Sequence, residues 1–187
     1  AIAEEAHQWG LRVAAHAHGA AGIRAAIRAG IDTIEHASLI DAEGIRLARE
    51  RGTWLVMDIF NTEYTQSQGR ANGILEDNLR KDREIAQIQR DNFREAHEAG
   101  VRMLFGSDAG VMPHGDVGKQ FRTMVQYGMT PLEAIQAATR NAAEGFAELL
   151  RESGSNPDLL NPLTDDLAGP QRPGTPYDGI WACACLI

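Results

Sequence analysis

The chain has 187 residues, of which 43% are hydrophobic and 24% charged, and this balance is ordinary for a single globular domain. The formal net charge is −8 and charges of both signs alternate along the helical stretches, which argues against a nucleic-acid-binding face and favours a small-molecule substrate. No stretch approaches the roughly 20 uninterrupted apolar residues of a membrane span, and the first residues, AIAEEAHQWG, lack the pattern of a signal peptide. We therefore expect a cytoplasmic protein that binds neither membranes nor nucleic acid. The chain opens with Ala1 inside an apparent helix, so we also expect further sequence upstream.

The first part of the chain alternates short apolar runs with stretches of helical period, which is typical of βα units around a parallel sheet. A strand is predicted over residues 11–16 and a helix over 20–30. A second strand over residues 32–36 leads to a helix that opens at Asp41, a plausible N-cap, and ends near Gly52.

The same alternation continues in the second part of the chain. A third strand over residues 53–59 leads into a polar segment and then a long charged helix over 74–99. The fourth strand covers residues 101–108, and after a Gly-containing loop a helix is predicted over 117–127. The pattern indicates successive copies of one βα unit.

A last helix and a tail close the chain. The sequence TPLE at residues 130–133 offers Thr as N-cap, Pro at the first helical position and Glu to close a capping box, and this helix is predicted to reach Leu150. The composition then becomes rich in Pro and Gly. We expect one structured domain over residues 1–150 and an irregular tail over 151–187.

Three of the predicted strands end in side chains that can bind a metal. The first closes with His16 and His18, the second with His36 and the fourth with Asp108. In a parallel barrel the carboxyl ends of all strands emerge on one face, so these residues are expected to converge. Any one of them has an ordinary alternative, because a strand-end His is often structural and an Asp after Gly-Ser often forms a turn. Their joint occurrence favours a metal site.

Four motifs together resemble the amidohydrolase superfamily, in the branch that holds imidazolonepropionase-like proteins, Xaa-Pro dipeptidases and Arg/Lys carboxypeptidases. They are VAAHAHG, AGIDTIEHAS, GSDAGVMPHG and MTPLEAIQAATRNAAE, and the resemblance covers roughly residues 1–145. It implies an α/β fold, the C-terminal half (strands 5 to 8) of a TIM-type (β/α)8 metal-dependent hydrolase barrel. It also implies that His16 and His36 bind one divalent metal, usually zinc, and that Asp108 binds a second metal and acts as the catalytic proton shuttle.

The residue types agree with that chemistry. Neutral imidazoles and a carboxylate suit Zn²⁺, which lowers the pKa of a bound water to about 7 and polarises a carbonyl. A carboxylate beside that water can take its proton and return it to a leaving amine. Hydrolysis of an amide C–N bond follows, with one or two metal ions as cofactor.

Several other polar residues could either bind substrate or be structural. His18 shares a strand face with His16 and either contacts substrate or is structural. His114, which matches a family position facing the site, is otherwise a surface-loop residue, and Tyr64 either hydrogen-bonds a substrate carboxylate or is a plain loop tyrosine. His7 and His97 lie near helix C-termini and are expected to be structural.

The sequence also departs from the family pattern. The His-x-His of the family's first strand and the metal-bridging lysine of its fourth are not in this chain, and Lys81 and Lys119 stand in the wrong places to replace that lysine. We expect the isolated chain to be inactive and prone to associate, and the full-length protein to be a homo-oligomer.

The leading interpretation is a metal-dependent amidohydrolase that acts on dipeptides or on C-terminal residues. The HAHG sequence favours a peptidase, because ring-opening relatives tend to show His-x-x-Glu at this strand. An imidazolonepropionase-like cyclic amide hydrolase is the alternative within the enzymes. A non-catalytic metal-binding half-barrel is the alternative outside them.

Overall fold

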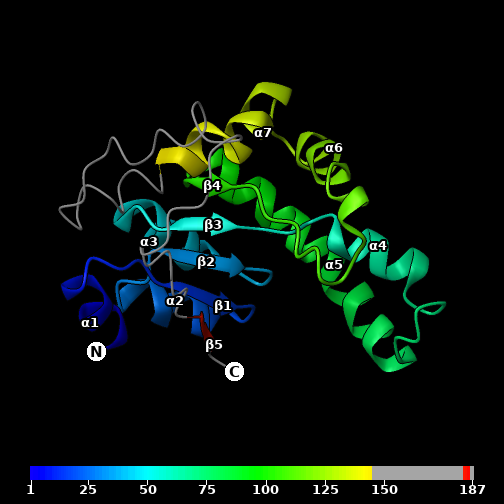
Figure 1. The fold of residues 1–187 in the computed structure, drawn as a ribbon, viewed down its shortest axis with the longest axis horizontal. Helices are drawn as coiled ribbons and strands as arrows, with labels where there is room; N and C mark the ends of the chain where they lie inside the picture. Colours follow the sequence, from blue (N-terminus) through cyan, green and yellow to red (C-terminus); the bar gives the residue numbers. More distant parts are fainter. Residues whose placement is uncertain (145–182, 186–187) are drawn as a thin grey trace, which may run out of the picture.

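The computed structural model describes residues 1–144 and the backbone of Cys183–Cys185, and helices and strands alternate along it (Figure 1). The helices with described bounds are α1 (Ile2–Gln8), α2 (Ala20–Arg28), α3 (Ala42–Arg51), α4 (Asn61–Gln68), α5 (Glu76–Glu98), α6 (Lys119–Gln126) and α7 (Pro131–Ala138), with the 3-10 turn η1 (His114–Asp116). The strands are β1 (Ala14–Ala17), β2 (Thr33–His36), β3 (Trp54–Val56), β4 (Met103–Leu104) and β5 (Cys183–Cys185).

The strands form one parallel sheet in the order β4-β3-β2-β1-β5. Strands β1 to β4 therefore lie side by side in chain order, each linked to the next through helices (Figure 1). This arrangement confirms the predicted α/β class with parallel strands. Because the strands run in the same direction, their carboxyl ends share one edge of the sheet.

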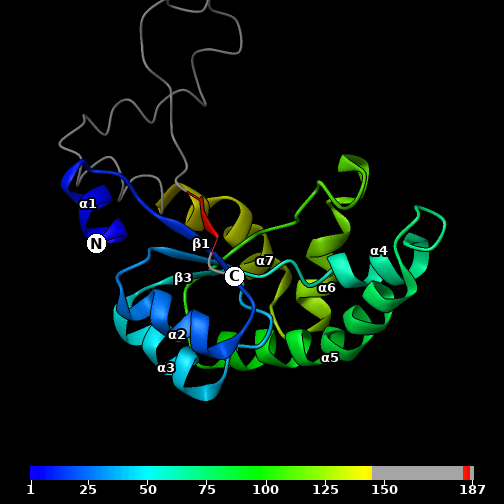
Figure 2. The ribbon, with the colours of Figure 1, turned by 90° about the horizontal axis from the view of Figure 1, so that it is seen from below.

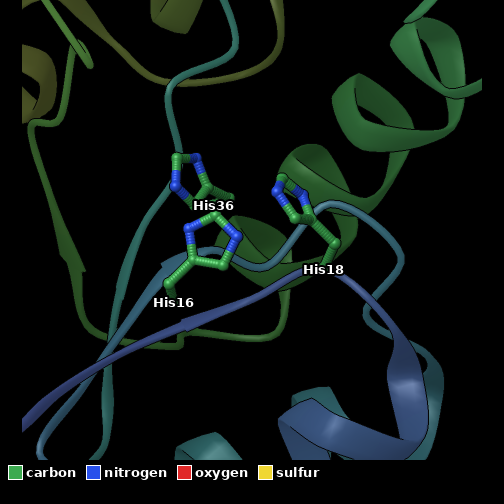
Figure 3. A group of neighbouring side chains, drawn as sticks. All are labelled: His16, His18 and His36. Carbon is green, nitrogen blue, oxygen red and sulfur yellow. The ribbon is translucent and has the colours of Figure 1, made fainter. Parts of the chain in front are cut away.

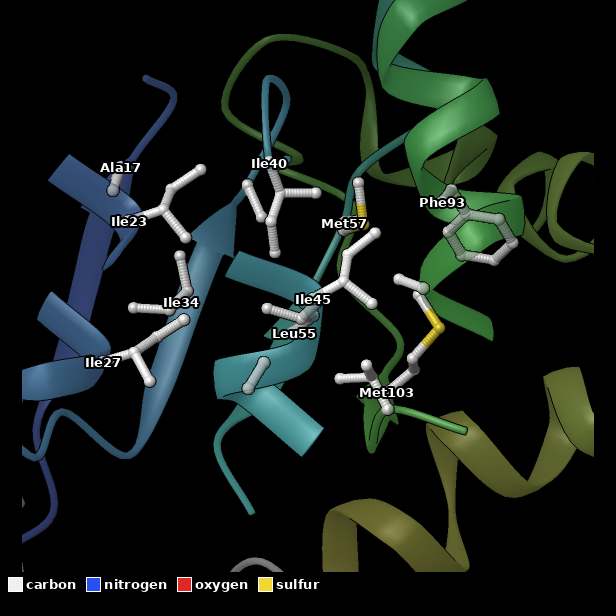
Figure 4. Close-up of a cluster of buried hydrophobic side chains, with 14 of the residues drawn as sticks. Ala17, Ile23, Ile27, Ile34, Ile40, Ile45, Leu55, Met57, Phe93 and Met103 are labelled. Atoms are coloured by element: carbon white, nitrogen blue, oxygen red, sulfur yellow. The ribbon is translucent and has the colours of Figure 1, made fainter. Parts of the chain in front are cut away.

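The core lies between the sheet and a layer of helices formed by α2, α3 and α5 (Figure 2). Ile23 and Ile27 project from α2 at helical spacing and are fully buried near Ile34 of β2, while Leu55 of β3 and Phe93 of α5 extend the same cluster (Figure 4). Full burial of a side chain of this size stabilises the fold by about 1.5–3 kcal/mol. This packed layer holds the strands, and so the positions of their ends, in place.

The predicted starts of α3 and α7 are confirmed by the caps recognised in the sequence. The Asp41 carboxylate accepts a hydrogen bond from the Gly44 amide at 2.9 Å, and Gly52 ends α3 in a left-handed conformation with φ of 70°. At α7 the Thr130 hydroxyl accepts from the Glu133 amide at 3.2 Å, and the Glu133 carboxylate accepts from the Thr130 amide at 2.7 Å. This is the expected capping box.

The structure differs from the sequence expectations at three places. The polar segment after β3 contains the helix α4. Strand pairing at β4 stops at Leu104, so Asp108 lies on a turn and not at the end of the strand. The helix expected to reach Leu150 is wrong as a single element, because α7 ends at Ala138 and the chain turns at Thr139 before residues 140–144 become helical again.

Two expectations from the sequence concern the tail of the chain and the absence of a membrane span. The irregular tail over residues 151–187 lies outside the described residues, apart from Cys183–Cys185, whose backbone pairs with β1 as β5. Among the described residues, no helix is long and apolar enough to cross a membrane.

Candidate metal centre

Five side chains that can bind a metal gather at the carboxyl edge of the sheet. They are His16 and His18 on and just after β1, His36 at the end of β2, Asp58 two residues past β3 and Asp108 four residues past β4. The potential ligand atoms lie within 4.8 Å of one another in each of two groups, the three histidines and the trio of His36, Asp58 and Asp108. His36 belongs to both groups.

The three imidazoles face one another (Figure 3). The ring centroids of His16 and His36 lie 4.5 Å apart, and the ring of His18 lies 4.7 Å from each of the other two. The expectation that these strand ends converge therefore holds in the geometry.

Strand alternation alone does not bring His36 to this cluster. In the parallel pairing of β1 and β2, His36 stands opposite Ala17, whose side chain is buried on the helix-covered face, whereas His16 stands opposite Glu35. A regular strand would thus send His16 and His36 to opposite faces. The backbone of His36 has φ of 68° and that of Ala37 has φ of 46°, both left-handed. This turn, which costs about 1–3 kcal/mol per residue, re-aims the His36 ring towards His16.

A buried carboxylate fixes the orientation of His36. The Asp58 Oδ1 atom lies 2.9 Å from Nδ1 of His36, and the Asp58 side chain is only 8% exposed. Because a carboxylate only accepts, Nδ1 carries the proton, and the lone pair of the neutral ring is on Nε2. Nε2 is therefore the nitrogen of His36 that can bind a metal.

The charges of the pair shift both pKa values. Burial alone would lower the pKa of His36, but the hydrogen bond from His36 to Asp58 and the negative charge of Asp58 outweigh it and raise that pKa. Burial alone would raise the pKa of Asp58, and the hydrogen bond and positive charge of His36 lower it instead. Burial, followed by the positive charge of His36, lowers the pKa values of His16 and His18. Those two rings are neutral at pH 7 and offer lone pairs.

Asp108 is exposed and lies on a turn with a left-handed backbone, φ of 47°. Its Oδ2 atom accepts a hydrogen bond of 3.1 Å from the amide of Asn61. Gly106 permits the approach of this segment to β3, because a Cβ atom there would come within 2.5 Å of the Val56 side chain. The exposed Asp108 carboxylate is thus held by Asn61 through one of its two oxygens.

His18 is held by the loop that follows β2. Its Nδ1 atom lies 2.9 Å from the hydroxyl of Ser38, which is 1% exposed, and the backbone carbonyl of Ser38 accepts a hydrogen bond from Asn92 of α5. The long helix α5 thus holds Ser38, and through it His18, in place.

The donor set fits a divalent metal ion. Two neutral rings, a third ring whose Nδ1 proton is held by Asp58, and an accessible carboxylate are the ligands that zinc favours in catalytic sites. The compact spacing of the ligand atoms agrees with binding of a small cation by either group, and His36 is the residue common to both groups.

Two sequence candidates do not join this cluster. Tyr64 lies on α4, where its hydroxyl accepts a hydrogen bond from Asn72, and it lines a cavity of about 440 Å³ whose lining includes none of the three histidines. His114 is exposed in η1 and belongs to neither group of potential ligands found among the described residues. Their substrate-binding roles stay predictions.

Sequence reasoning missed Asp58 and Asn61. The signal for Asp58 was available, because the third apolar run, TWLVMD, also ends in a metal-capable residue, just as the other three do. No sequence pattern pointed to Asn61, whose role depends on contacts to two different strand ends.

Comparisons with known proteins show the family of this chain. The model of the amidohydrolase family matches residues 1–147. Ochratoxinase of Aspergillus niger is 38% identical over 147 residues, which cover 75% of this chain and 29% of the relative. A solved structure of a Xaa-Pro dipeptidase with methionine bound in the active site is 39% identical with a TM-score of 0.70, and the match covers 81% of this chain and 36% of that one. A prolidase complexed with N-methylphosphonate-L-proline is 30% identical with a TM-score of 0.72, covering 82% and 36%. The chain spans about a third of the length of these relatives.

Proposed function

We propose that this chain, which belongs to the amidohydrolase family, supplies part of the centre of a metal-dependent hydrolase that cleaves the C–N bond of dipeptides or of C-terminal residues. The observation that carries this proposal is the convergence of His16, His36 and Asp108 at one edge of the sheet. His16 and His36 would hold the metal through ring nitrogens, and Asp108 would contribute a carboxylate beside it.

The chain's own residues then perform the proton transfers. When bound, a divalent metal, for which zinc suits these ligands best, supplies a water of lowered pKa as nucleophile and polarises the scissile carbonyl. The exposed Asp108 carboxylate accepts the proton of the attacking water as the new C–O bond forms. It returns that proton to the amine nitrogen as the C–N bond breaks, so the carboxylate ends the cycle unchanged.

The names of the relatives support a small peptide-like substrate. A dipeptidase, a prolidase and ochratoxinase are similar to this chain over most of its length. We propose that the cavity beside Tyr64 takes part of the substrate, because Phe60, the neighbour of Asn61, lines it. Two cations also line it, Lys119 paired with Asp116 and Arg122 paired with Glu63. In this proposal Tyr64 hydrogen-bonds a substrate carboxylate, while His18 and His114 contact the remainder of the substrate.

Hydrolysis by the intact protein that carries this sequence tests the proposal. Protein stripped with a chelator should lose dipeptide hydrolysis and regain it with zinc. His16→Ala and His36→Ala should each lose at least about a thousandfold in kcat/KM. His7→Ala is the matched control, because His7 lies at the opposite end of the sheet and should leave activity unchanged.

Unchanged activity in both site variants would exclude the catalytic assignment. A panel of Xaa-Pro dipeptides, other dipeptides, N-acyl amino acids and a cyclic amide separates the alternatives. Preference for the cyclic amide would favour the imidazolonepropionase-like reaction. Metal binding without turnover of any substrate would favour a non-catalytic metal-binding protein.

A further inference from the structure

We propose that Asp58 and Asn61 form a positioning unit that connects the metal-binding histidine His36 to the proton-carrying Asp108. This inference rests on the proposed function above. Hydrogen bonds run without a gap from His36 Nδ1 to Asp58 at 2.9 Å, from the Asn61 amide to Asp58 at 3.0 Å and from the same amide to Asp108 at 3.1 Å. Neither Asp58 nor Asn61 needs to touch substrate for this role.

Asp58 acts on His36. Its Oδ1 atom accepts the Nδ1 proton, which selects the tautomer with the lone pair on Nε2 and fixes the rotation of the ring. The buried amide of Gln89 lies 3.4 Å from the same oxygen. The left-handed backbone at His36 brings the ring to the cluster, and this hydrogen bond then fixes its rotation.

Asn61 acts on Asp108. Its Nδ2 group has two protons, which suffice for the Oδ2 atoms of both Asp58 and Asp108. The opposite amide orientation would set Oδ1 against two carboxylates, whereas in the present one Oδ1 accepts from the Thr65 hydroxyl at 3.3 Å. The amide therefore holds one oxygen of Asp108 in place and leaves the other for the reaction.

The turn that carries both residues is itself fixed by a buried side chain. Gln120 of α6 is fully buried, donates to the Met57 carbonyl at 2.8 Å and accepts from the Phe60 amide at 2.8 Å. Gln120 thus binds the backbone directly before Asp58 and directly before Asn61. A side chain amide that satisfies two backbone groups in this way makes the turn rigid.

The two ends of the unit share an unusual feature. The non-glycine residues with positive φ in the described part of the chain are His36, Ala37 and Asp108. Two of these three are the residues that Asp58 and Asn61 bind. Backbone strain of this kind persists only where surrounding contacts hold it, and here one short chain of hydrogen bonds reaches both strained positions.

Cobalt titration of the intact protein tests the unit, with the visible absorption of bound Co²⁺ as a readout besides activity. Asp58→Asn should weaken cobalt affinity about 10–100-fold and change the absorption spectrum, because the amide no longer fixes His36. Asn61→Ala should leave cobalt affinity within about threefold of wild type and lower kcat about 10–100-fold at similar KM. Asn61→Ser, which keeps a hydrogen-bond donor, should recover part of that kcat.

Asp32→Asn is the matched control, since Asp32 is another buried aspartate paired with a histidine, distant from the centre at the other end of the sheet. It should keep the wild-type cobalt spectrum and affinity. Wild-type cobalt binding and kcat in both Asp58→Asn and Asn61→Ala would overturn the positioning unit, as would equal cobalt loss in Asp32→Asn protein that circular dichroism shows to be folded. His36→Ala separates a failure of the positioning unit from a failure of the proposed function. Loss of cobalt binding in His36→Ala supports the proposed function whatever Asp58→Asn does. Wild-type cobalt binding in His36→Ala would refute both the proposed function and the positioning unit.

Discussion

Two histidine–aspartate pairs lie at opposite ends of the same sheet. His36 and Asp58 meet at the carboxyl end and His7 and Asp32 at the amino end, each pair with a nitrogen–oxygen distance of 2.9 Å and an aspartate side chain 8% exposed. Their surroundings differ. Asp32 also accepts from the Arg12 guanidinium at 2.5 Å and from the Val13 amide at 2.8 Å.

Within residues 1–144, the hydrogen-bond and ion-pair partners of Asp58 at the carboxyl end include no arginine or lysine. Asp58 accepts from His36 and from the side-chain amides of Asn61 and Gln89, and a second carboxylate, Asp108, lies on the far side of Asn61. A carboxylate with an arginine beside it is neutralised and serves the fold, whereas two carboxylates beside three imidazoles retain capacity for a cation. We therefore expect the pair at the amino end to serve the fold, and we propose that the pair at the carboxyl end serves the metal centre.

The largest expected difference between the two ends is in catalysis. Asp108→Asn removes the proton acceptor and should lower kcat about 10²–10⁴-fold, because an amide cannot carry the proton. Steady-state hydrolysis of a dipeptide by the intact protein measures the effect. Asp77→Asn, at an 84% exposed aspartate on α5, should retain wild-type kcat, and an equal loss there would contradict the assignment of Asp108.

Stability should show the reverse pattern. Asp32→Asn removes a carboxylate that serves the Arg12 guanidinium, the His7 ring and a backbone amide at once, and should lower the free energy of unfolding by about 3 kcal/mol. Urea denaturation of metal-free protein measures the change. If Asp32→Asn lost less stability than Asp58→Asn, the amino-end pair would not be the one that serves the fold.

The pH dependence of the unfolding free energy tests whether His36 and Asp58 form an ion pair. The raised pKa of His36 means that its contribution is complete below about pH 6.5 and lost as the pH rises through the folded pKa. The lowered pKa of Asp58 means that its contribution is complete above about pH 3.8 and lost as the pH falls through the folded pKa. Asp58→Asn should therefore destabilise metal-free protein most, by about 1–2 kcal/mol, between about pH 4 and 6.5.

Thermal denaturation of both metal-free proteins at pH 5 and pH 8.5 measures that window. The difference in melting temperature between wild type and Asp58→Asn should shrink at the higher pH. A constant difference would show that the ionised pair does not form.

The smallest expected effect lies away from both ends. Thr130→Ala removes the N-cap of α7 and should lower the free energy of unfolding by about 1 kcal/mol without changing kcat. Urea denaturation and a dipeptide assay check the two halves of this statement. Thr139→Ala, at the end of the same helix, is the comparison for a threonine outside the capping box, and an equal loss there would argue against the cap.

Much of the fold followed from sequence pattern alone. The alternation of apolar runs with helical periods identified the parallel βα order, and capping residues such as Asp41 and Thr130 located helix starts, because these signals are local. The break at Thr139 was not predictable, since neither Gly nor Pro marks it.

The candidate site was predictable only in part. His16, His36 and Asp108 were predicted because each ends a predicted strand, and parallel strands bring their carboxyl ends together. The left-handed turn at His36 that makes the rings meet has no glycine to signal it. The support from Asn61 depends on hydrogen bonds between segments up to 47 residues apart, which no local pattern encodes.

Anomalous diffraction at the zinc edge, from crystals of the intact protein grown with zinc, tests the metal centre most directly. The expected result is an anomalous peak at the carboxyl end of the sheet, about 2.0–2.1 Å from a ring nitrogen of both His16 and His36, with the nitrogen of His36 being Nε2. No peak there, or zinc bound only at the amino end between His7 and Asp32, would contradict the assignment of the carboxyl end as the metal centre.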